Sequence, residues 1–440
     1  MRSDRDREVW LLALPILGGM ASQNLLNLVD AWMVGGLGPA ALAATGLANF
    51  LNFMAVAFIT GFSPAVQAIA ARRIGEGRAS EAGAPLNGGI LLSLGLGIPL
   101  TVLLVLMAPA IFSALNSDPE VVREGVPYLQ WRLVAIAAVG INFSFRGYWS
   151  ARKLAGYYLQ TLLLMHALNI VFSYSLIHGL WGLPRMGTAG AGLGTTLAII
   201  VGTAAYVALG LRHAHDQGVF TRRPSAEQFR SLLKLGLPSS IQNLLFSAGF
   251  AALFWIVGQV GTAELAVANV LVTITLTAVL PGIAFGIAAA TLSGQAMGRG
   301  EPEEAHRWMW DVYRVSLRVF VPLAAVMVIA PDPILGLFVR DPALVALGRL
   351  PLQLIGATIL LDGLGLILMQ ALLGVGAAKL VMVVATGLQW GLFLPAAWLL
   401  GPVYGLGLLW IWVAMGSYRL LQTAIFAHAW QRRGWVQIKV

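Results

Sequence analysis

Residues 9–34 read VWLLALPILGGMASQNLLNLVDAWMV, a run long enough to cross a bilayer as one helix. The run contains Asp30, and an ionised carboxylate in hydrocarbon costs roughly 2.5–3.5 kcal/mol on insertion scales. Gln23 and Asn27 precede Asp30 at spacings that place the three side chains on one helical face. We therefore predict a polar stripe in which Asp30 holds a proton or a cation, with a possible bend at Pro15.

The composition is that of a polytopic membrane protein. The chain has 440 residues, of which 58% are hydrophobic and 11% are charged, whereas about 25% of a soluble domain is charged. The absence of cysteine excludes disulfides, thiolate metal sites and thiol catalysis. The first apolar run is too long and too polar for a cleaved signal peptide, so we expect it to be retained as a span.

Hydropathy predicts an all-α protein with twelve membrane-spanning helices, because backbone groups in lipid must be satisfied within each segment. The predicted spans of the first half are Val9–Val34, Leu42–Ala71, Leu86–Ala108, Val126–Phe145, Leu159–Ile177 and Gly190–Leu211. Those of the second half are Leu235–Val257, Leu265–Ala296, Val312–Ala330, Leu350–Leu373, Leu380–Leu400 and Gly405–Ala427.

The basic residues indicate how the chain is oriented in the membrane. If the N-terminus is cytoplasmic, 23 of the 28 Lys and Arg residues fall in segments on the cytoplasmic side. This bias predicts that both termini are cytoplasmic. The net charge of +9 is thus interpreted as an orientation signal, and we expect no nucleic acid partner.

The chain repeats itself at an offset of 223 residues, the distance from Pro15 to Pro238. The pairs that superpose at this offset include Pro15 with Pro238, Gly38 with Gly261, and Asp118-Pro119 with Asp341-Pro342. Six spans in each half give two parallel repeats, a pattern typical of transporters. We predict an N-terminal six-helix lobe at 1–211, a cytoplasmic linker at 212–231 and a C-terminal six-helix lobe at 232–440.

Polar residues within the other spans give further candidates. Asp362, in the tenth span, is the second intramembrane acid, and it lacks an amide stripe of its own. In the fifth span Asn169 and Ser173 share a face with His166, which we interpret chiefly as a packing hydrogen bond. Thr195, in the sixth span, follows a run of small residues that favours close helix packing, and it offers a cavity hydroxyl.

Several catalytic motifs are absent from the sequence. It contains no G-x-x-x-x-G-K-[ST] loop, no HExxH and no GxSxG. We therefore predict that the chain is not an enzyme, does not hydrolyse ATP itself and needs no cofactor.

The residues resemble the multidrug and toxic compound extrusion (MATE) family over essentially the whole chain. The stretches that carry the resemblance are Pro15, Gln23-Asn24, Val29-Asp30, Met33-Val34-Gly35, Leu42 to Gly46, Asn169, Gly187 to Gly192, and Asp362 with Gly374. Membership implies a V-shaped pair of six-helix lobes that exports organic cations and other xenobiotics in exchange for protons or sodium. It also implies that Asp30 is the coupling residue of the N-terminal lobe and that Asp362 belongs to a cation site in the C-terminal lobe.

The sequence departs from the family pattern at three positions. Phe246 stands where sodium-coupled relatives have a glutamate, and Thr358 where they have a tyrosine. Ser173 replaces a second acid found in many relatives after the fifth-span asparagine. These departures weaken the case for sodium in the C-terminal lobe and leave the N-terminal site with a single carboxylate.

The leading interpretation is a monomeric multidrug exporter of the bacterial inner membrane that exchanges small organic cations for protons. Sodium, bound at Asp30 and Asn169, is the alternative coupling ion. A flippase for lipid-linked sugars or other lipids is the second interpretation, and it would require a basic central cavity, to which Arg132 could contribute. We expect Asp30 to be essential for coupling and Asp362 to affect only some substrates.

Overall fold

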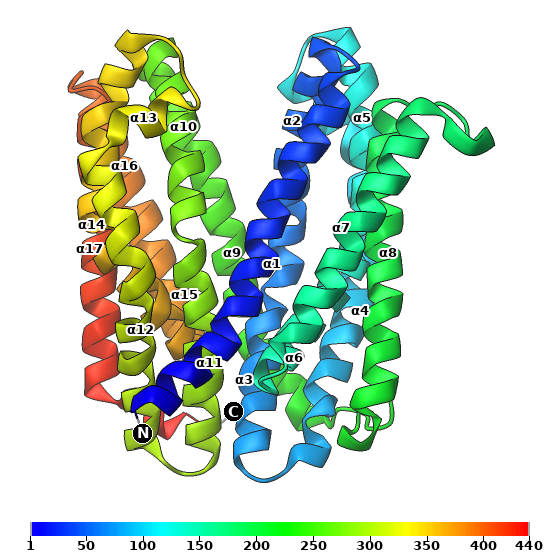
Figure 1. Cartoon of the computed structure of the whole chain (residues 1–440), viewed down its shortest axis with the longest axis vertical. Helices are drawn as coiled ribbons and strands as arrows, with labels where there is room; N and C mark the ends of the chain where they lie inside the picture. The colour runs from blue at the N-terminus through cyan, green and yellow to red at the C-terminus, as the bar shows by residue number, and fades with distance from the viewer. Residues whose placement is uncertain (1, 439–440) are drawn as a thin grey trace. The chain divides into compact units, whose positions relative to one another are not determined.

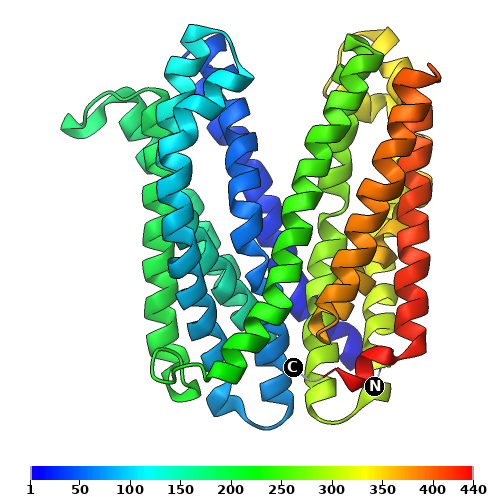
Figure 2. The same cartoon turned by 180° about the vertical axis from the view of Figure 1, so that it is seen from behind.

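The computed structural model describes residues 2–438, and its regular elements are helices (Figures 1 and 2). The chain forms two compact units, which we describe separately. We call Pro15–Leu244 the N-terminal unit, and Met1–Leu14 together with Leu245–Val440 the C-terminal unit. The division into 1–211, 212–231 and 232–440 stays a prediction.

The helices of the N-terminal unit are α1 (Arg2–Gly35, from Pro15 on), α2 (Pro39–Thr60), α3 (Phe62–Gly75), α4 (Gly83–Leu115), α5 (Pro119–Val134), α6 (Ile136–Ala151), α7 (Ala155–His178), α8 (Thr188–His213) and the first half of α9 (Ala226–Val260). Those of the C-terminal unit are the rest of α9, α10 (Thr262–Ala278), α11 (Leu280–Gly298), α12 (Pro302–Ile329), α13 (Pro331–Gly336), α14 (Pro342–Gly374), α15 (Ala378–Leu388), α16 (Leu394–Trp398) and α17 (Leu408–Arg432).

The predicted all-α architecture with twelve spans is confirmed. Among the described residues, ten helical segments are long and apolar enough to cross a membrane. The pair α5 and α6, bent by 46° at Ala135, covers the predicted fourth span. Helix α17 lies where the twelfth span is predicted.

Small residues bring α7 and α8 into close contact. A Cβ on Gly194 would lie 2.5 Å from the backbone nitrogen of Ser173, and one on Gly190 would lie 2.7 Å from the carbonyl of Leu176. Such distances leave no room for a side chain. The expectation that the small-residue run of the sixth span permits close packing is confirmed.

The connector between α8 and α9 is held against α4. The side-chain nitrogen of Asn87 donates hydrogen bonds to the carbonyls of Gly218 (2.8 Å) and Arg222 (2.7 Å). Its side-chain oxygen accepts from the backbone N–H of Phe220 at 2.9 Å. This one amide therefore satisfies three backbone groups in a segment that the sequence marks only as polar.

The first turns of α1 pack within the C-terminal unit. The Arg5 guanidinium lies 2.5 Å from Glu304 and 2.7 Å from Asp311, and the Trp10 ring meets Phe285 edge to face at 5.3 Å. Asp6 pairs with two further arginines of α12. The charges at the start of the chain thus meet a complementary set on α12.

The internal repeat is visible in the backbone. Asp118 caps α5 by accepting from the N–H of Glu120 at 2.9 Å, and Asp341 caps α14 by accepting from the N–H of Ala343 at the same distance. In both, proline occupies the first helical position, where no N–H partner is needed. The copies then diverge, because α14 runs unbroken through the position that corresponds to the bend between α5 and α6.

We expect Gly194→Ala to lower the apparent melting temperature of the detergent-purified protein, because the new methyl group would meet the backbone of Ser173. Overpacking of this kind costs about 1–3 kcal/mol. Gly46→Ala in α2, where an added Cβ meets nothing within 4 Å, is the matched control and should be neutral or stabilising. Equal melting temperatures for the two variants would contradict the close α7–α8 packing.

Candidate functional site

The polar stripe on α1 continues onto α7. The side-chain nitrogen of Gln23 donates to the Asn27 oxygen at 3.2 Å, and the Gln23 oxygen lies 3.1 Å from Nε2 of His166. Gln23 and Asn27 are exposed, whereas His166 is buried. His166 is thus a hydrogen-bond partner of the stripe, in agreement with its interpretation as a packing contact.

Asp30 has one carboxylate oxygen without a partner. Its Oδ1 is buried, and within the described residues it has no hydrogen-bond partner. A buried polar atom in this condition calls for an explanation, such as a bound proton or ion. Asp30 therefore has the unsatisfied acceptor that a coupling site requires.

A basic residue lies within electrostatic range of this carboxylate. Arg132 of α5 is the charged side chain whose field acts on Asp30. Its Nη1 donates to the Tyr128 hydroxyl at 3.4 Å, and that hydroxyl donates to the Asn49 side-chain oxygen at 2.8 Å. The carboxylate is accordingly part of a cluster that contains a positive charge two turns or less from the bend at Ala135.

The remaining predicted residues of the N-terminal unit form a second group on α7 and α8. Asn169 donates to the Thr195 hydroxyl at 2.9 Å, and that hydroxyl donates to the Ala191 carbonyl at 3.0 Å. Ser173 donates to the same carbonyl at 3.4 Å. The structure therefore joins Asn169, Ser173 and Thr195 by hydrogen bonds, and the Asn169 side-chain oxygen is buried without a partner in the described part of the chain.

These residues suit a proton better than a metal ion. In the described residues no group of three or more His, Cys, Asp or Glu side chains could hold a metal. A dehydrated cation needs several oxygen ligands, and hard cations take carboxylates, carbonyls and amide oxygens. Asp30 offers one carboxylate, with a guanidinium charge nearby that opposes a second positive charge.

Asp362 has a partner that the sequence analysis did not identify. Arg419 of α17 donates from Nη1 to its Oδ1 at 3.2 Å, and the two side chains are only 12% and 15% exposed. We had grouped Arg419 with the bases outside the spans, but its side chain is buried within the C-terminal unit. Hydropathy alone does not show that this arginine faces an acid on α14.

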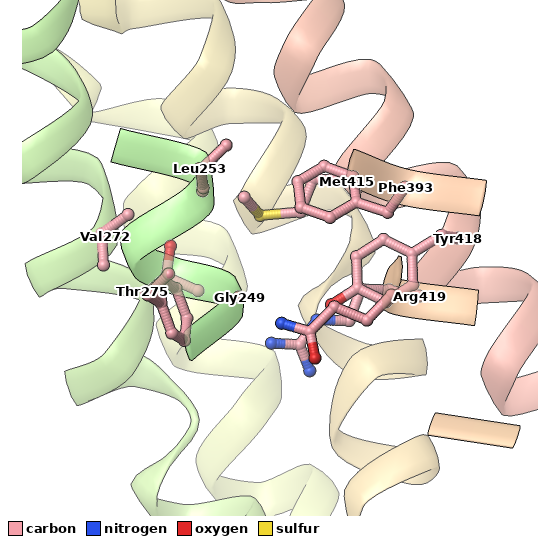
Figure 3. Close-up of a pocket in the computed structure, with 10 residues that line it drawn as sticks. Gly249, Leu253, Val272, Thr275, Phe393, Met415, Tyr418 and Arg419 are labelled. Atoms are coloured by element: carbon pink, nitrogen blue, oxygen red, sulfur yellow. The ribbon is translucent and has the colours of Figure 1, made fainter. Parts of the chain in front are cut away.

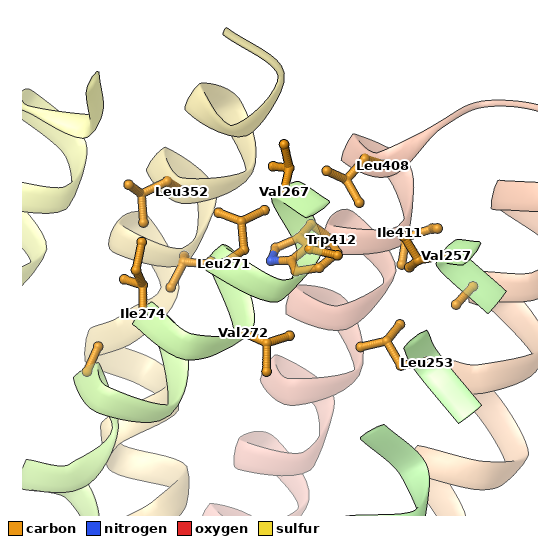
Figure 4. Packing of buried hydrophobic residues seen from close by; sticks show 14 of the residues in the cluster. Leu253, Val257, Val267, Leu271, Val272, Ile274, Leu352, Leu408, Ile411 and Trp412 are labelled. Carbon is orange, nitrogen blue, oxygen red and sulfur yellow. The ribbon is translucent and has the colours of Figure 1, made fainter. Parts of the chain in front are cut away.

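Arg419 lines a pocket in the C-terminal unit (Figure 3). Phe250 and Leu253 of α9, Phe393, and Tyr418 form its apolar walls, and Gln389 adds an amide. The wall residues belong to the buried cluster around Trp412, Leu271 and Val267 that forms the core of this unit (Figure 4). The core therefore fixes the walls of the pocket.

Comparison with known proteins places these features in a family. Two segments, residues 15–175 and 238–399, each match the family model described as MatE. Their starting points are 223 residues apart, the offset of the internal repeat. The chain belongs to the MatE family.

Relatives match over nearly the full length of the chain. The multidrug resistance protein NorM of Burkholderia vietnamiensis is 28% identical over 418 residues, which cover 92% of this chain and 89% of that protein. A structure described as the outward-facing conformation of a multidrug resistance MATE family transporter of the MOP superfamily has a TM-score of 0.90 at 22% identity, covering 100% of this chain and 98% of that one. A MOP superfamily transporter from Pyrococcus furiosus, reported with a binding pocket of reverse polarity, has a TM-score of 0.89 at 21% identity, covering 99% and 97%.

Membership in the MatE family makes the chain a multi-pass membrane protein of a transporter family. The structural matches support the same helical fold. Transport by such proteins needs side chains that bind and release a solute, and no cofactor chemistry is required.

Sequence reasoning missed several polar residues of the site. Asn49 and Tyr128 carry no signal that links them, because their hydrogen bond joins α2 to α5. Arg419 has a weak signal, since it interrupts the apolar run of the last span, as Arg132 does in the fourth. An arginine inside a span indicates a buried partner, and a search of the opposite spans for a lone acid would have found Asp362.

We expect Asn169→Ala and Thr195→Val to have less than additive effects on stability, because both remove the same buried hydrogen bond. The coupling between them should be about 0.5–1.5 kcal/mol in denaturant unfolding of the micelle-bound protein. A control cycle pairs Asn169→Ala with Thr101→Val, whose hydroxyl donates elsewhere, to the Leu133 carbonyl. Additive effects in the first cycle, or equal coupling in the two, would contradict a direct bond.

Proposed function

We propose that this protein is a multidrug exporter that exchanges organic cations and other xenobiotics for protons, with Asp30 as the coupling residue. The observation that carries the proposal is the buried Oδ1 of Asp30, which has no partner among the described residues. Family membership and the relatives named for multidrug resistance support export as the direction of transport. We place the protein as a monomer in the bacterial inner membrane, with both termini in the cytoplasm.

The mechanism rests on competition for one carboxylate. Ionised Asp30 attracts a cationic substrate, and protonation removes that attraction, so the proton and the substrate exclude each other at this residue. Arg132 limits the number of positive charges that the cluster can hold at one time. Each ligand then biases the transporter toward the conformation that it binds more tightly.

The hydrogen-bonded groups around Asp30 have supporting roles in this proposal. Gln23 and Asn27 keep the face of α1 polar, while Asn169, Ser173 and Thr195 provide neutral hydrogen-bonding groups on α7 and α8. Neutral groups can orient a substrate without fixing the charge state of the carboxyl. A sodium ion would need these oxygens to gather around Asp30, which is why we favour protons.

Asp362 has a subordinate place in the proposed mechanism. Its charge is balanced by Arg419 at 3.2 Å, so it attracts a cation less than an unpaired carboxylate does. The flippase alternative is less favoured for a related reason. Both Arg132 and Arg419 have a carboxylate within electrostatic range, which argues against a strongly basic cavity for a lipid phosphate.

We expect Asp30→Asn to abolish efflux of a fluorescent organic cation from reconstituted vesicles, because the amide cannot take up and release a proton. Transport should fall to the level of empty vesicles. Glu120→Gln, which changes an exposed acid at the start of α5, is the matched control and should retain wild-type transport. Full transport by Asp30→Asn, at equal protein per vesicle, would rule out Asp30 as the coupling residue.

We expect an imposed proton gradient to drive transport in the absence of sodium. A sodium gradient at equal pH on both sides should drive little, because a single carboxylate does not replace the hydration shell of sodium. The same vesicles, tested with each gradient separately, provide the comparison. Strong transport driven by sodium alone would reverse the assignment of the coupling ion.

A further inference from the structure

The structure holds a second charged site, away from Asp30, in the C-terminal unit. We propose that the pocket beside Arg419 binds the carboxylate of a small aromatic acid, with Asp362 as the internal competitor for the guanidinium. This site goes beyond the proposed cation-proton exchange and does not depend on it.

The first argument is the position of the guanidinium. Arg419 both lines the pocket and pairs with Asp362, so one side chain connects a buried ion pair to open space (Figure 3). A guanidinium carries five N–H donors in a planar fork, and the bond to Asp362 uses one of them. The remaining donors suit a second carboxylate, which an arginine can bind through two parallel hydrogen bonds.

The second argument is the shape and chemistry of the walls. The Phe393 and Tyr418 rings are stacked with their centroids 4.7 Å apart, and Phe250 and Leu253 lie across from them. The pocket has about 350 Å³ of space between atoms, including space open to its surroundings. A guanidinium beside flat apolar walls matches a ligand with one aromatic ring and one anionic group.

The third argument is the irregular helix that forms one wall. Residues Gln389–Phe393 make a π-helical turn, and such turns occur frequently at functional sites. The turn directs the Gln389 side chain toward α9, where its nitrogen donates to the Phe246 carbonyl at 3.3 Å. A Cβ on Gly249 would lie 2.0 Å from that nitrogen, so α9 has a glycine where the amide enters.

A purely structural ion pair is the competing explanation. A buried pair is weak evidence for stability, because removing two charges from water costs free energy that the attraction between them barely offsets. A structural pair could be shielded completely by apolar side chains, but this arginine lines a pocket instead. The two explanations differ in whether the site distinguishes an anion from a neutral molecule of the same shape.

Three probes of nearly equal shape make that distinction. They are 4-fluorobenzoate, 4-fluorobenzamide and 4-fluorobenzamidine, which are anionic, neutral and cationic. Binding to the full-length protein in nanodiscs, without ion gradients, is followed by fluorine NMR. We expect the benzoate to bind about tenfold more tightly than the benzamide, with the benzamidine weakest, because a hydrogen bond to a charged group is worth about one order of magnitude in affinity.

Variants test whether the preference arises at Arg419. Arg419→Gln should remove the preference for benzoate, and Arg419→Lys should retain part of it, since lysine keeps the charge without the fork. Asp362→Asn should strengthen benzoate binding several-fold by removing the competing carboxylate. Met415→Trp fills the pocket while leaving the ion pair in place, and it should weaken binding of all three probes.

The matched control is the exposed pair of Arg349 and Asp332 in the same unit, where a guanidinium also contacts a carboxylate. Arg349→Gln and Asp332→Asn should leave benzoate affinity unchanged. Equal affinity for the three probes in the wild type would overturn the proposal. Unchanged benzoate binding in folded Arg419→Gln or Met415→Trp would do so too.

Asp30→Asn separates this inference from the proposed function. That variant should retain benzoate binding although it loses efflux. Loss of efflux with intact benzoate selectivity supports both proposals, whereas normal efflux with intact selectivity contradicts the role of Asp30 alone.

Discussion

A charge within the hydrocarbon layer needs compensation from the protein itself, and the two intramembrane acids obtain it in different ways. Asp362 is in direct contact with Arg419, whereas Asp30 lies in the field of Arg132 and keeps a buried oxygen without a partner among the described residues. Direct contact favours one charge state, and a partly compensated environment allows two. The contrast explains why acids of the same kind are assigned different tasks.

The helical backbone imposes a second requirement, because its polar groups must be satisfied wherever a helix bends or ends. Asp118 and Asp341 meet it at two helix starts, and Asn87 meets it for the connector that follows α8. The glycines of α8 let α7 approach closely enough for Asn169 and Thr195 to bond. The polar groups of the candidate site are thus positioned by the same packing that closes the helix bundle.

The sequence was sufficient to predict features that depend on one helix or on regular spacing. The spans follow from hydropathy, the repeat from a constant offset, and the prominence of Asp30 from the cost of an acid in lipid. Contacts between helices could not be predicted in this way: the Asp362–Arg419 pair and the Tyr128–Asn49 bond join segments far apart in the chain. The π-helical turn at Gln389 has no sequence signal, since it arises from packing against α9.

The two aspartate caps also bear on how the chain evolved. Asp118 and Asp341 occupy equivalent positions and make the same bond, so the cap dates from a half-length ancestor whose gene was duplicated and fused. Asp30 corresponds to Leu253, and Asp362 corresponds to Val139. The helix ends were therefore inherited in two copies, while each acid was kept or gained in one copy. Fusion freed the halves from the identity that a symmetric pair of ancestral chains would have required.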